Sequence, residues 1–259
     1  MTALPKHSNN WNKITPPLRP TPAVAAAFRA LSKPGRTLMF GVTPELHAVF
    51  PDLLAVDGNP EMIRSVWPGD TLLKKAQVGE WMDMGFAPRS FANVIGDGAI
   101  TMLSSQDNIR KIQNEAYKWL EPGGIFIHRL FETPSETISK DSLIEILNNP
   151  ATINWNAFKV LMMFHQAQTN NYVNHLTGVL DLFNEMAPDR DAVCRATGWD
   201  RSIVDTIDLY QGIGTITYKP NRAQWIDMIP EDAVNINFHV VPGYDLCEMC
   251  PIMTWEKKR

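Results

Sequence analysis

The segment from Arg36 to Asp57 constrains the fold of this chain more than any other part of the sequence. It reads RTLMFGVTPELHAVFPDLLAVD, so a short apolar run leads into a turn at Gly41 and a second apolar run ends at an acid. In a parallel α/β sheet, this order places a ligand over the first strand-to-helix turn, with its ribose hydroxyls against the carboxylate of Asp57. The segment therefore predicts a site for a cofactor that contains a nucleoside.

The glycine content of the turn narrows the class of cofactor. A dinucleotide site needs glycines at G-x-G-x-x-G spacing, so that a pyrophosphate can approach the backbone at a helix N-terminus. Only Gly41 is present here, followed by Thr43, Pro44 and Glu45, and the charge of Glu45 would repel a phosphate. A cofactor with an adenosine and no phosphate fits better, and S-adenosylmethionine is the common one.

Four further segments follow this turn in a recognisable order: LLAVDGNPEMI, GEWMDM, FANVIGDGAITML and WLEPGGIFIHRLF. In this order the chain resembles the class I S-adenosylmethionine-dependent methyltransferases over residues 22–131, and more weakly in its last strands. The first loop resembles a branch of that superfamily with G-x-T-P-E-L. The usual family loop has an acid where this chain has Met39, and glycines where it has Thr43 and Glu45.

The apolar pattern and the resemblance predict the fold. Helices are expected after Thr21 and after Ser104 or Ser105, and strands at residues 37–40, 53–56, 72–77, 91–95 and 124–131. Alternation of strands and helices implies a parallel sheet with right-handed crossovers. Runs at 233–241 and 250–256 match the antiparallel pair that closes a methyltransferase sheet. We expect an α/β fold: a doubly wound, mostly parallel seven-stranded sheet, Rossmann-like, with a helical insertion before the last two strands.

The chain divides into three parts by composition. Residues 1–21 are rich in proline and asparagine and predict an N-terminal arm over the domain. Residues 22–259 predict a single methyltransferase-like domain, although two smaller domains remain an alternative at this length. Within it, residues 132–210 have helical spacing and are too long for an ordinary strand connection. We interpret them as an insertion that forms the acceptor pocket and lid.

Charge and hydropathy exclude several classes of partner. The net charge is −4, and lysine and arginine cluster only in the terminal KKR, so no nucleic-acid footprint is predicted. No apolar run approaches the ~20 residues that span a bilayer, and the first residues lack the apolar core of a signal peptide. We expect a cytoplasmic protein without nucleic-acid or membrane partners, and a homodimer remains open.

The cysteines form one short motif. Three cysteines in 259 residues make no disulfide framework, but Cys247 and Cys250 form a C-x-x-C. This pair could belong to a redox site or to half of a zinc site. No second Cys/His pair lies at ligand spacing, so we favour an apolar strand at this segment and expect no metal.

The cofactor residues follow from the ends of the predicted strands. Asp57 can accept from both ribose hydroxyls, the alternative being a helix-capping aspartate before Asn59. Trp81 and Met82 stand where the family brackets the adenine, with Met62 opposite, although all three could be core residues. Asp97 follows the strand that neighbours the first. The predicted cofactor-binding residues are Phe40, Gly41, Val42, Asp57, Gly58, Met62, Trp81, Met82, Gly96, Asp97 and Gly98.

The acceptor side has weaker signals. Methyl transfer needs mainly in-line positioning, so no catalytic motif is required and none is assigned. Arg129 and Glu132 end an apolar strand and are expected to face the acceptor. His165 and Tyr210, and also His128 or His175, could join them if the insertion covers the site, although a lone histidine is more often structural. The predicted substrate-binding residues are Arg129, Glu132, His165 and Tyr210.

Three functions are compatible with these patterns. The first is a methyltransferase that acts on an O or N atom of a small-molecule acceptor; no N-P-P-Y-like tetrapeptide follows Asp97, which argues against amino groups of bases or of glutamine. The second is a binding or regulatory protein that keeps the fold without turnover, suggested by the altered glycine loop. The third, a nicotinamide-dependent oxidoreductase, is disfavoured by the missing glycines.

Overall fold

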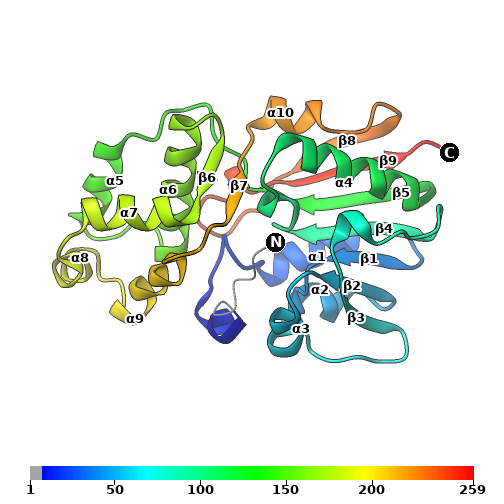
Figure 1. The fold of residues 1–259 in the computed structure, drawn as a ribbon, viewed down its shortest axis with the longest axis horizontal. Helices are drawn as coiled ribbons and strands as arrows, with labels where there is room; N and C mark the ends of the chain where they lie inside the picture. Colours follow the sequence, from blue (N-terminus) through cyan, green and yellow to red (C-terminus); the bar gives the residue numbers. More distant parts are fainter. Residues whose placement is uncertain (1–7) are drawn as a thin grey trace.

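The computed structural model describes residues 8–259, so the first seven residues of the predicted arm lie outside the described part of the chain. A seven-stranded sheet with the order β3-β2-β1-β4-β5-β9-β8 forms one lobe of the molecule (Figure 1). Its strands are β1 (Thr37–Phe40), β2 (Leu53–Asp57), β3 (Lys74–Val78), β4 (Phe91–Asp97), β5 (Leu120–Arg129), β8 (Ala233–His239) and β9 (Ile252–Lys257).

The direction of the strands confirms the predicted fold class. The first five strands run parallel, whereas β9 is antiparallel to both β5 and β8. The chain proceeds from β1 outward to β3 and then returns to the other side of β1 as β4, so the order reverses between β1 and β4. In open α/β sheets, the crevice beyond the carboxyl ends of such strands is where ligands bind.

Helices cover both faces of the sheet because its strands are apolar on both sides. Along β1, Leu38 and Phe40 belong to one hydrophobic core and Met39 to the other, which is the period of two expected for a strand. One face packs against α1 (Pro22–Leu31), α2 (Pro44–Val49) and α3 (Pro60–Val66), and the other against α4 (Gln106–Trp119) and α10 (Arg222–Asp227).

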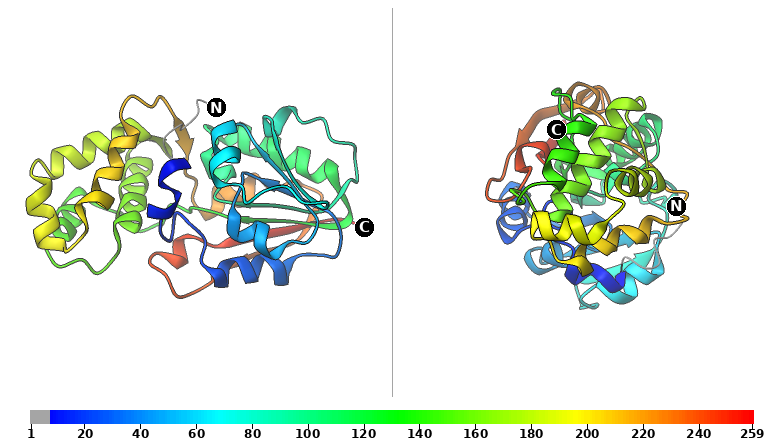
Figure 2. Two further views of the ribbon diagram at one scale, coloured as in Figure 1. Left: turned by 90° about the horizontal axis from the view of Figure 1, so that it is seen from below. Right: turned by 90° about the vertical axis from the view of Figure 1, so that its left-hand side faces the viewer.

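A second lobe lies beyond the carboxyl ends of β4 and β5 (Figures 1 and 2). It contains α5 (Lys140–Leu147), α6 (Trp155–Thr169), α7 (Leu176–Met186), α8 (Arg190–Thr197), α9 (Arg201–Val204) and the 3-10 helix η4 (Asp205–Tyr210). These helices pack around a hydrophobic core of their own that includes Trp155, Phe158 and Phe183. The segment therefore folds as a helical layer facing the end of the sheet.

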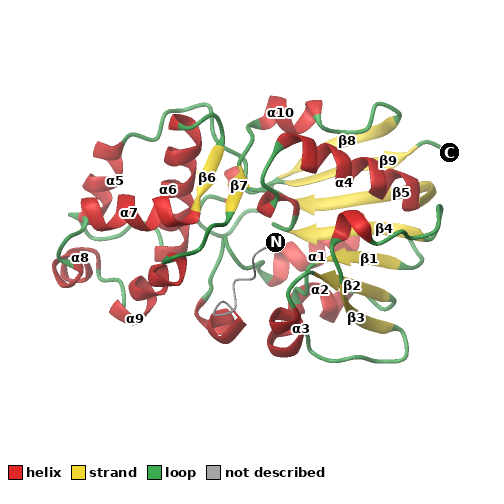
Figure 3. Cartoon of the chain, viewed as in Figure 1, coloured by secondary structure: helices red, strands yellow, loops and turns green. Residues whose placement is uncertain are grey.

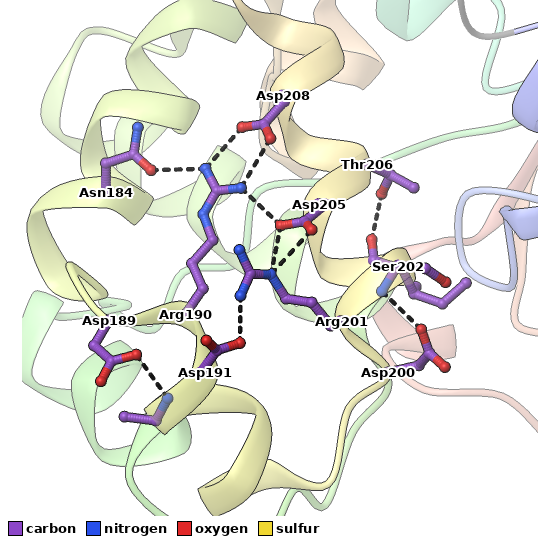
Figure 4. A network of polar contacts seen from close by, with 12 residues as sticks. Asn184, Asp189, Arg190, Asp191, Asp200, Arg201, Ser202, Asp205, Thr206 and Asp208 are labelled. Atoms are coloured by element: carbon purple, nitrogen blue, oxygen red, sulfur yellow. Dashed lines mark hydrogen bonds and ion pairs between the residues drawn. The ribbon is translucent and has the colours of Figure 1, made fainter.

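Two arginines hold the end of this helical lobe together (Figure 4). Arg190 donates to Asp208 at 2.7 Å and to Asp205 at 2.9 Å, and Arg201 donates to Asp205 at 2.8 Å and also to Asp191. The network joins α8, α9 and η4, and thereby fixes the short helix that ends at Tyr210. Surface ion pairs are a better argument for stability where several charges form such a network.

Strand ends are shifted, since β5 begins at Leu120 and not at residue 124, and two segments have another structure than expected. Strands β6 (Val173–His175) and β7 (Ile216–Tyr218) form a separate antiparallel pair where helix was expected for β6 (Figure 3). Three residues are too few for a period of two to be recognised in a sequence. The C-x-x-C segment is also not strand: Cys247–Met249 form the 3-10 helix η5, and β9 begins only after Pro251, which cannot donate to a ladder.

The remaining short elements are the 3-10 helices η1 (Ser8–Lys13), η2 (Trp81–Asp83) and η3 (Ile100–Met102). Among the helices of residues 8–259, none is both long and apolar enough to cross a bilayer.

Candidate active site

A pocket of about 290 Å³ opens at the carboxyl ends of β1, β2 and β4. The lining comes from turns at this end of the sheet, from η1 and the segment after it, and from the helical lobe. The lining residues are Trp11, Ile14, Leu18, Phe40, Gly41, Val42, Thr43, Asp57, Gly58, Asn59, Met62, Trp81, Asp97, Gly98, Ala99, Met102, Phe131, Lys159, Met163, Leu176, Tyr210, Thr215, Thr217 and Lys219.

The turn after β1 is open toward the pocket at Gly41. Its backbone has φ of +83°, a conformation that favours glycine, and its N–H donates to the Val56 carbonyl at 2.8 Å. A Cβ at this position would find only Asp57 Oδ2 nearby, at 3.9 Å, once its chain neighbours are set aside. The space above the turn is thus free for a ligand that approaches the backbone closely.

Asp57 ends β2 with one carboxylate oxygen committed and one available. Oδ1 accepts the Asn59 N–H at 2.8 Å, while Oδ2 lies beside Gly41 and accepts no hydrogen bond from the described residues. The alternative that Asp57 caps the next helix does not hold, because the Asn59 side chain caps α3. Burial raises the pKa of Asp57 to about 6; the Asn59 N–H opposes the rise and the charge of Glu80 adds to it.

The residues predicted to bracket an adenine divide between pocket and core. Trp81 is nearly buried, its indole N–H donates to the Val56 carbonyl at 2.7 Å, and its ring stacks on Phe40 with centroids 5.2 Å apart. Trp81 and Met62 line the pocket, whereas Met82 packs against the core below it. An aromatic and a thioether surface therefore meet the pocket near the end of β2.

Asp97 reaches the pocket from β4, with Arg129 directly behind it. The two residues are register partners in β4 and β5, and Arg129 Nη2 donates to Asp97 Oδ2 at 3.0 Å. The Arg129 side chain is 1% exposed and does not line the pocket, contrary to the expectation that it faces an acceptor. Its guanidinium instead compensates the buried charge of Asp97.

The other predicted residues separate in the same way. Tyr210 and Gly98 line the pocket. Gly96 is packed under His128, with which a Cβ at this position would collide. Glu132 lies outside the pocket and accepts from Arg222 Nε at 2.6 Å, and His165 Nδ1 is 2.7 Å from the Ile138 carbonyl within the helical lobe.

His128 and His175 also lie outside the pocket. His128 is fully buried and stacks on Phe126 at 4.0 Å, and its burial keeps the pKa of the imidazole well below the usual value. His175 is the residue that precedes α7. Neither histidine is placed to contact a ligand in this pocket.

Sequence reasoning missed the two lysines of the pocket. Lys159 lies in α6 and Lys219 follows β7, and they are 3% and 2% exposed. Burial lowers the pKa of each to about 7. One signal was available: Lys159 is the single charge in the apolar run AFKVLMMF. Lys219 had none, because its position depends on the β6·β7 pair.

The N-terminal segment also contributes unexpected residues. Trp11, Ile14 and Leu18 line the pocket, and Arg19 forms an ion pair with Glu45 in α2 at 2.5 Å. The charge of Glu45, which argued against a phosphate at this helix, is therefore compensated from the arm. This contact brings the arm against the turn that follows β1.

The chemistry of the lining fits a cofactor with an adenosine and a short polar tail. Gly41 leaves room above the backbone, Asp57 Oδ2 is an available acceptor for a ribose hydroxyl, and Trp81 and Met62 offer flat and polarisable surface. Only one glycine lies in the turn where a pyrophosphate site would need several. The residues present thus fit S-adenosylmethionine better than a dinucleotide.

No family model and no curated protein matches this sequence. Among solved structures, one named as SAM-dependent methyltransferases from Methanosarcina mazei is 12% identical, with 93% of this chain and 99% of that chain covered and a TM-score of 0.53. A Listeria monocytogenes protein, provisionally named as an S-adenosylmethionine dependent methyltransferase, is 11% identical, with 91% and 98% covered and a TM-score of 0.50. The chain has the class I methyltransferase fold of these proteins.

A third structure carries a different name. It is a Rhodobacter sphaeroides protein, provisionally named as a Zn-dependent alcohol dehydrogenase, 11% identical over 100% of both chains with a TM-score of 0.63. A likeness at this identity shows the fold alone. Within residues 8–259, no three His, Cys, Asp or Glu side chains gather where they could hold a metal ion. The activity therefore has to be argued from the pocket.

Proposed function

We propose that this protein is an S-adenosylmethionine-dependent methyltransferase that transfers the methyl group to an O or N atom of a small-molecule acceptor by in-line displacement. The observation that carries the proposal is that Gly41 and Asp57 lie side by side at the carboxyl ends of the adjacent parallel strands β1 and β2. The turn at Gly41 leaves the backbone accessible, and the free Oδ2 of Asp57 lies beside it. Support also comes from the methyltransferase fold.

Different residues around the pocket would hold different parts of the cofactor. Asp57 would hold the ribose, Trp81 and Met62 the adenine, and the turn formed by Phe40, Gly41 and Val42 the methionine part. When bound, S-adenosylmethionine supplies an activated methyl group on a sulfonium. The chain then has to orient the acceptor and exclude water, and apolar lining such as Met102 and Leu176 suits that task.

The acceptor space lies on the side of β4 and β5. Phe131 follows β5, Lys219 contacts the segment after β4, and Met163 and Tyr210 approach from the helical lobe. A pocket assembled from a lid and a sheet edge suits a small molecule. With these positions, the helical lobe and the arm would set acceptor specificity.

Calorimetry with S-adenosylhomocysteine and with NAD tests the cofactor assignment. We expect S-adenosylhomocysteine to bind and NAD not to bind. Asp57→Ala should weaken binding by about 1.5–3 kcal/mol, the range for hydrogen bonds to a charged group. Asp52→Ala is the matched control, because Asp52 precedes the opposite end of β2 and does not line the pocket. Equal affinity of wild type and Asp57→Ala would contradict the ribose assignment.

Turnover separates an enzyme from a binding protein. Transfer of a labelled methyl group from S-adenosylmethionine to a small-molecule extract would support the enzyme. Tight cofactor binding, with no transfer to any fraction of such an extract, would instead favour the binding or regulatory protein that the altered glycine loop suggested.

A further inference from the structure

Two buried lysines face the pocket on the side assigned to the acceptor. Lys159 and Lys219 are 3% and 2% exposed, and both line the cavity. They come from distant parts of the chain, one from α6 of the helical lobe and one from the segment after β7. The pocket thus receives two cationic side chains from two independent elements.

Neither lysine is paired with an acid in the described residues. Lys219 Nζ donates to the Thr101 carbonyl at 2.6 Å and lies 5.9 Å from the centroid of the Phe131 ring, and both contacts are neutral. Lys159 Nζ forms no ion pair or hydrogen bond with the described residues, and burial alone lowers the pKa of Lys159. A buried ammonium without a counter-charge is costly, and lysine is almost never fully buried unless it is paired.

Neither of the two acids that line the pocket is paired with one of these lysines. Asp97 is held by Arg129 through both carboxylate oxygens. Asp57 ends β2, which is separated from β4 by β1, whereas Lys219 contacts the segment that follows β4. Among the described residues, no acid that lines the pocket therefore supplies either lysine with a counter-charge.

The residues around the lysines indicate the chemistry of a ligand that would bind there. Met163 is one helical turn after Lys159 and lines the same pocket, together with Met102 and Leu176. Val160 and Phe164 pack against Phe131 below them. Apart from the two lysines, Tyr210 and the threonines of the β7 segment, the lysine side of the pocket is thus apolar.

We propose that the methyl acceptor is a small, largely apolar acid whose anionic group binds to Lys159 and Lys219. This proposal rests on the proposed function and adds the substrate class. Burial lowers the pKa of both lysines to about 7, so an anion nearby would restore their charged form as it binds. It would also balance the positive charge of the sulfonium.

Calorimetry at saturating S-adenosylhomocysteine and pH 7 tests the acid. The probes are benzoate, phenylacetate and indole-3-acetate, each with its matched primary amide, and phenyl phosphate as a second source of an oxyanion. We expect at least one acid to bind at least about tenfold more tightly than its amide. A stronger response to phenyl phosphate than to every carboxylate would identify a phosphate ester as the acid.

Variants assign the effect to the lysines. Lys159→Met and Lys219→Gln should each lower the affinity for the acid about tenfold or more, while the affinity for S-adenosylhomocysteine stays within a few-fold of wild type. Lys140→Met is the control, because Lys140 lies on the surface of the same lobe and pairs with Glu185. Retained S-adenosylhomocysteine binding also shows that each variant is folded.

The possible failures are distinguishable. If S-adenosylhomocysteine does not bind to wild type, the proposed function is wrong. If it binds but no acid binds more tightly than its amide, or if both variants keep the acid affinity of wild type, the proposal of an acidic acceptor is wrong. The proposed methyltransferase function is not contradicted by either result. If the variants lose affinity for S-adenosylhomocysteine but not for adenosine, the lysines bind the methionine carboxylate of the cofactor, which also overturns the proposal.

Discussion

Asp97 and Arg129 lie opposite each other in β4 and β5, and their side chains are joined by two hydrogen bonds while 3% and 1% exposed. Arg129 was expected to face the acceptor. It instead supports Asp97, which does line the pocket. Tyr244 completes the support, with its hydroxyl 3.4 Å from Arg129 Nη1.

Loss of Arg129 should therefore reduce stability. Arg129→Met leaves the Asp97 carboxylate buried without a partner, and we expect the free energy of unfolding to fall by about 3–5 kcal/mol in urea titrations. The double variant Asp97→Asn with Arg129→Met should recover part of the loss, because the uncompensated charge is gone. Wild-type stability of Arg129→Met, together with impaired methyl transfer, would instead restore the acceptor role.

Glu132→Gln should have little effect. The Glu132 side chain contacts Arg222, which is 42% exposed, and it does not line the pocket. Ion pairs with an exposed partner contribute about 0–1 kcal/mol, so stability should change by less than 1 kcal/mol. Cofactor affinity and acceptor turnover should stay at wild-type values. A large loss of turnover would show that the helical lobe moves Glu132 toward the acceptor.

Asp57→Asn should weaken cofactor binding and stabilise the ligand-free protein. The folded-state pKa of Asp57 is raised to about 6, so between its unfolded value of 3.8 and about 6 the native state binds more protons than the unfolded state. The stability of wild type therefore falls as pH rises through this window. At pH 7.5 the ligand-free variant should be more stable by roughly 1–2 kcal/mol.

The cofactor affinity of wild type should also depend on the ionisation of Asp57, but it should rise with pH where the stability falls. The affinity for S-adenosylhomocysteine should rise from pH 5 to pH 7, because only the ionised carboxylate accepts from both ribose hydroxyls. Asp57→Asn should show weaker binding with little pH dependence in this range. An unchanged profile in the variant would remove Asp57 from the site.

Lys159→Met should stabilise the ligand-free protein at neutral pH. The folded-state pKa of Lys159 is lowered from 10.5 to about 7, so at or below pH 7 wild type carries the full cost of the buried charge. The variant should be more stable there by about 2–5 kcal/mol in urea unfolding. Its advantage should shrink from pH 7 toward 10.5, where the unfolded state alone keeps the proton.

Other titratable groups in the pocket also affect the pH dependence of stability. Lys219, Tyr210, Asp57 and Asp97 line the same pocket, and Lys219 titrates in the same range. Burial alone lowers both pKa values, so Lys219 adds its own change of stability in this range to wild type and variant alike. Equal stability of the two proteins at pH 7 would show that Lys159 is hydrated or paired in solution.

The arm should respond to the cofactor. Trp11, Ile14 and Leu18 line the pocket, and Arg19 ties this segment to Glu45. Hydrogen exchange of the segment around Trp11 should slow when S-adenosylhomocysteine binds, and Arg19→Met should weaken that protection. If neither the arm nor α6 changes its exchange while the cofactor is demonstrably bound, neither acts as a lid.

Much of the fold was readable because it depends on local patterns. The boundaries of β1 and the start of α1 after Thr21 follow from apolar runs, a capping hydroxyl and a proline at the first helical position. The 3-10 helix at Cys247 and the short β6·β7 pair were not readable, because neither repeats often enough along the chain to show a period.

Sequence alone determined the parallel sheet, the glycine turn at its centre and the acid at the end of β2, because each is written in residues that are neighbours along the chain. Only tertiary structure decided which polar residues face the pocket. Arg129 ends a strand as expected, yet its side chain turns to Asp97, and Lys159 enters the pocket from a helix more than 100 residues after Asp57. Such choices depend on which elements pack together and on which buried charges find a partner, and no local pattern records either.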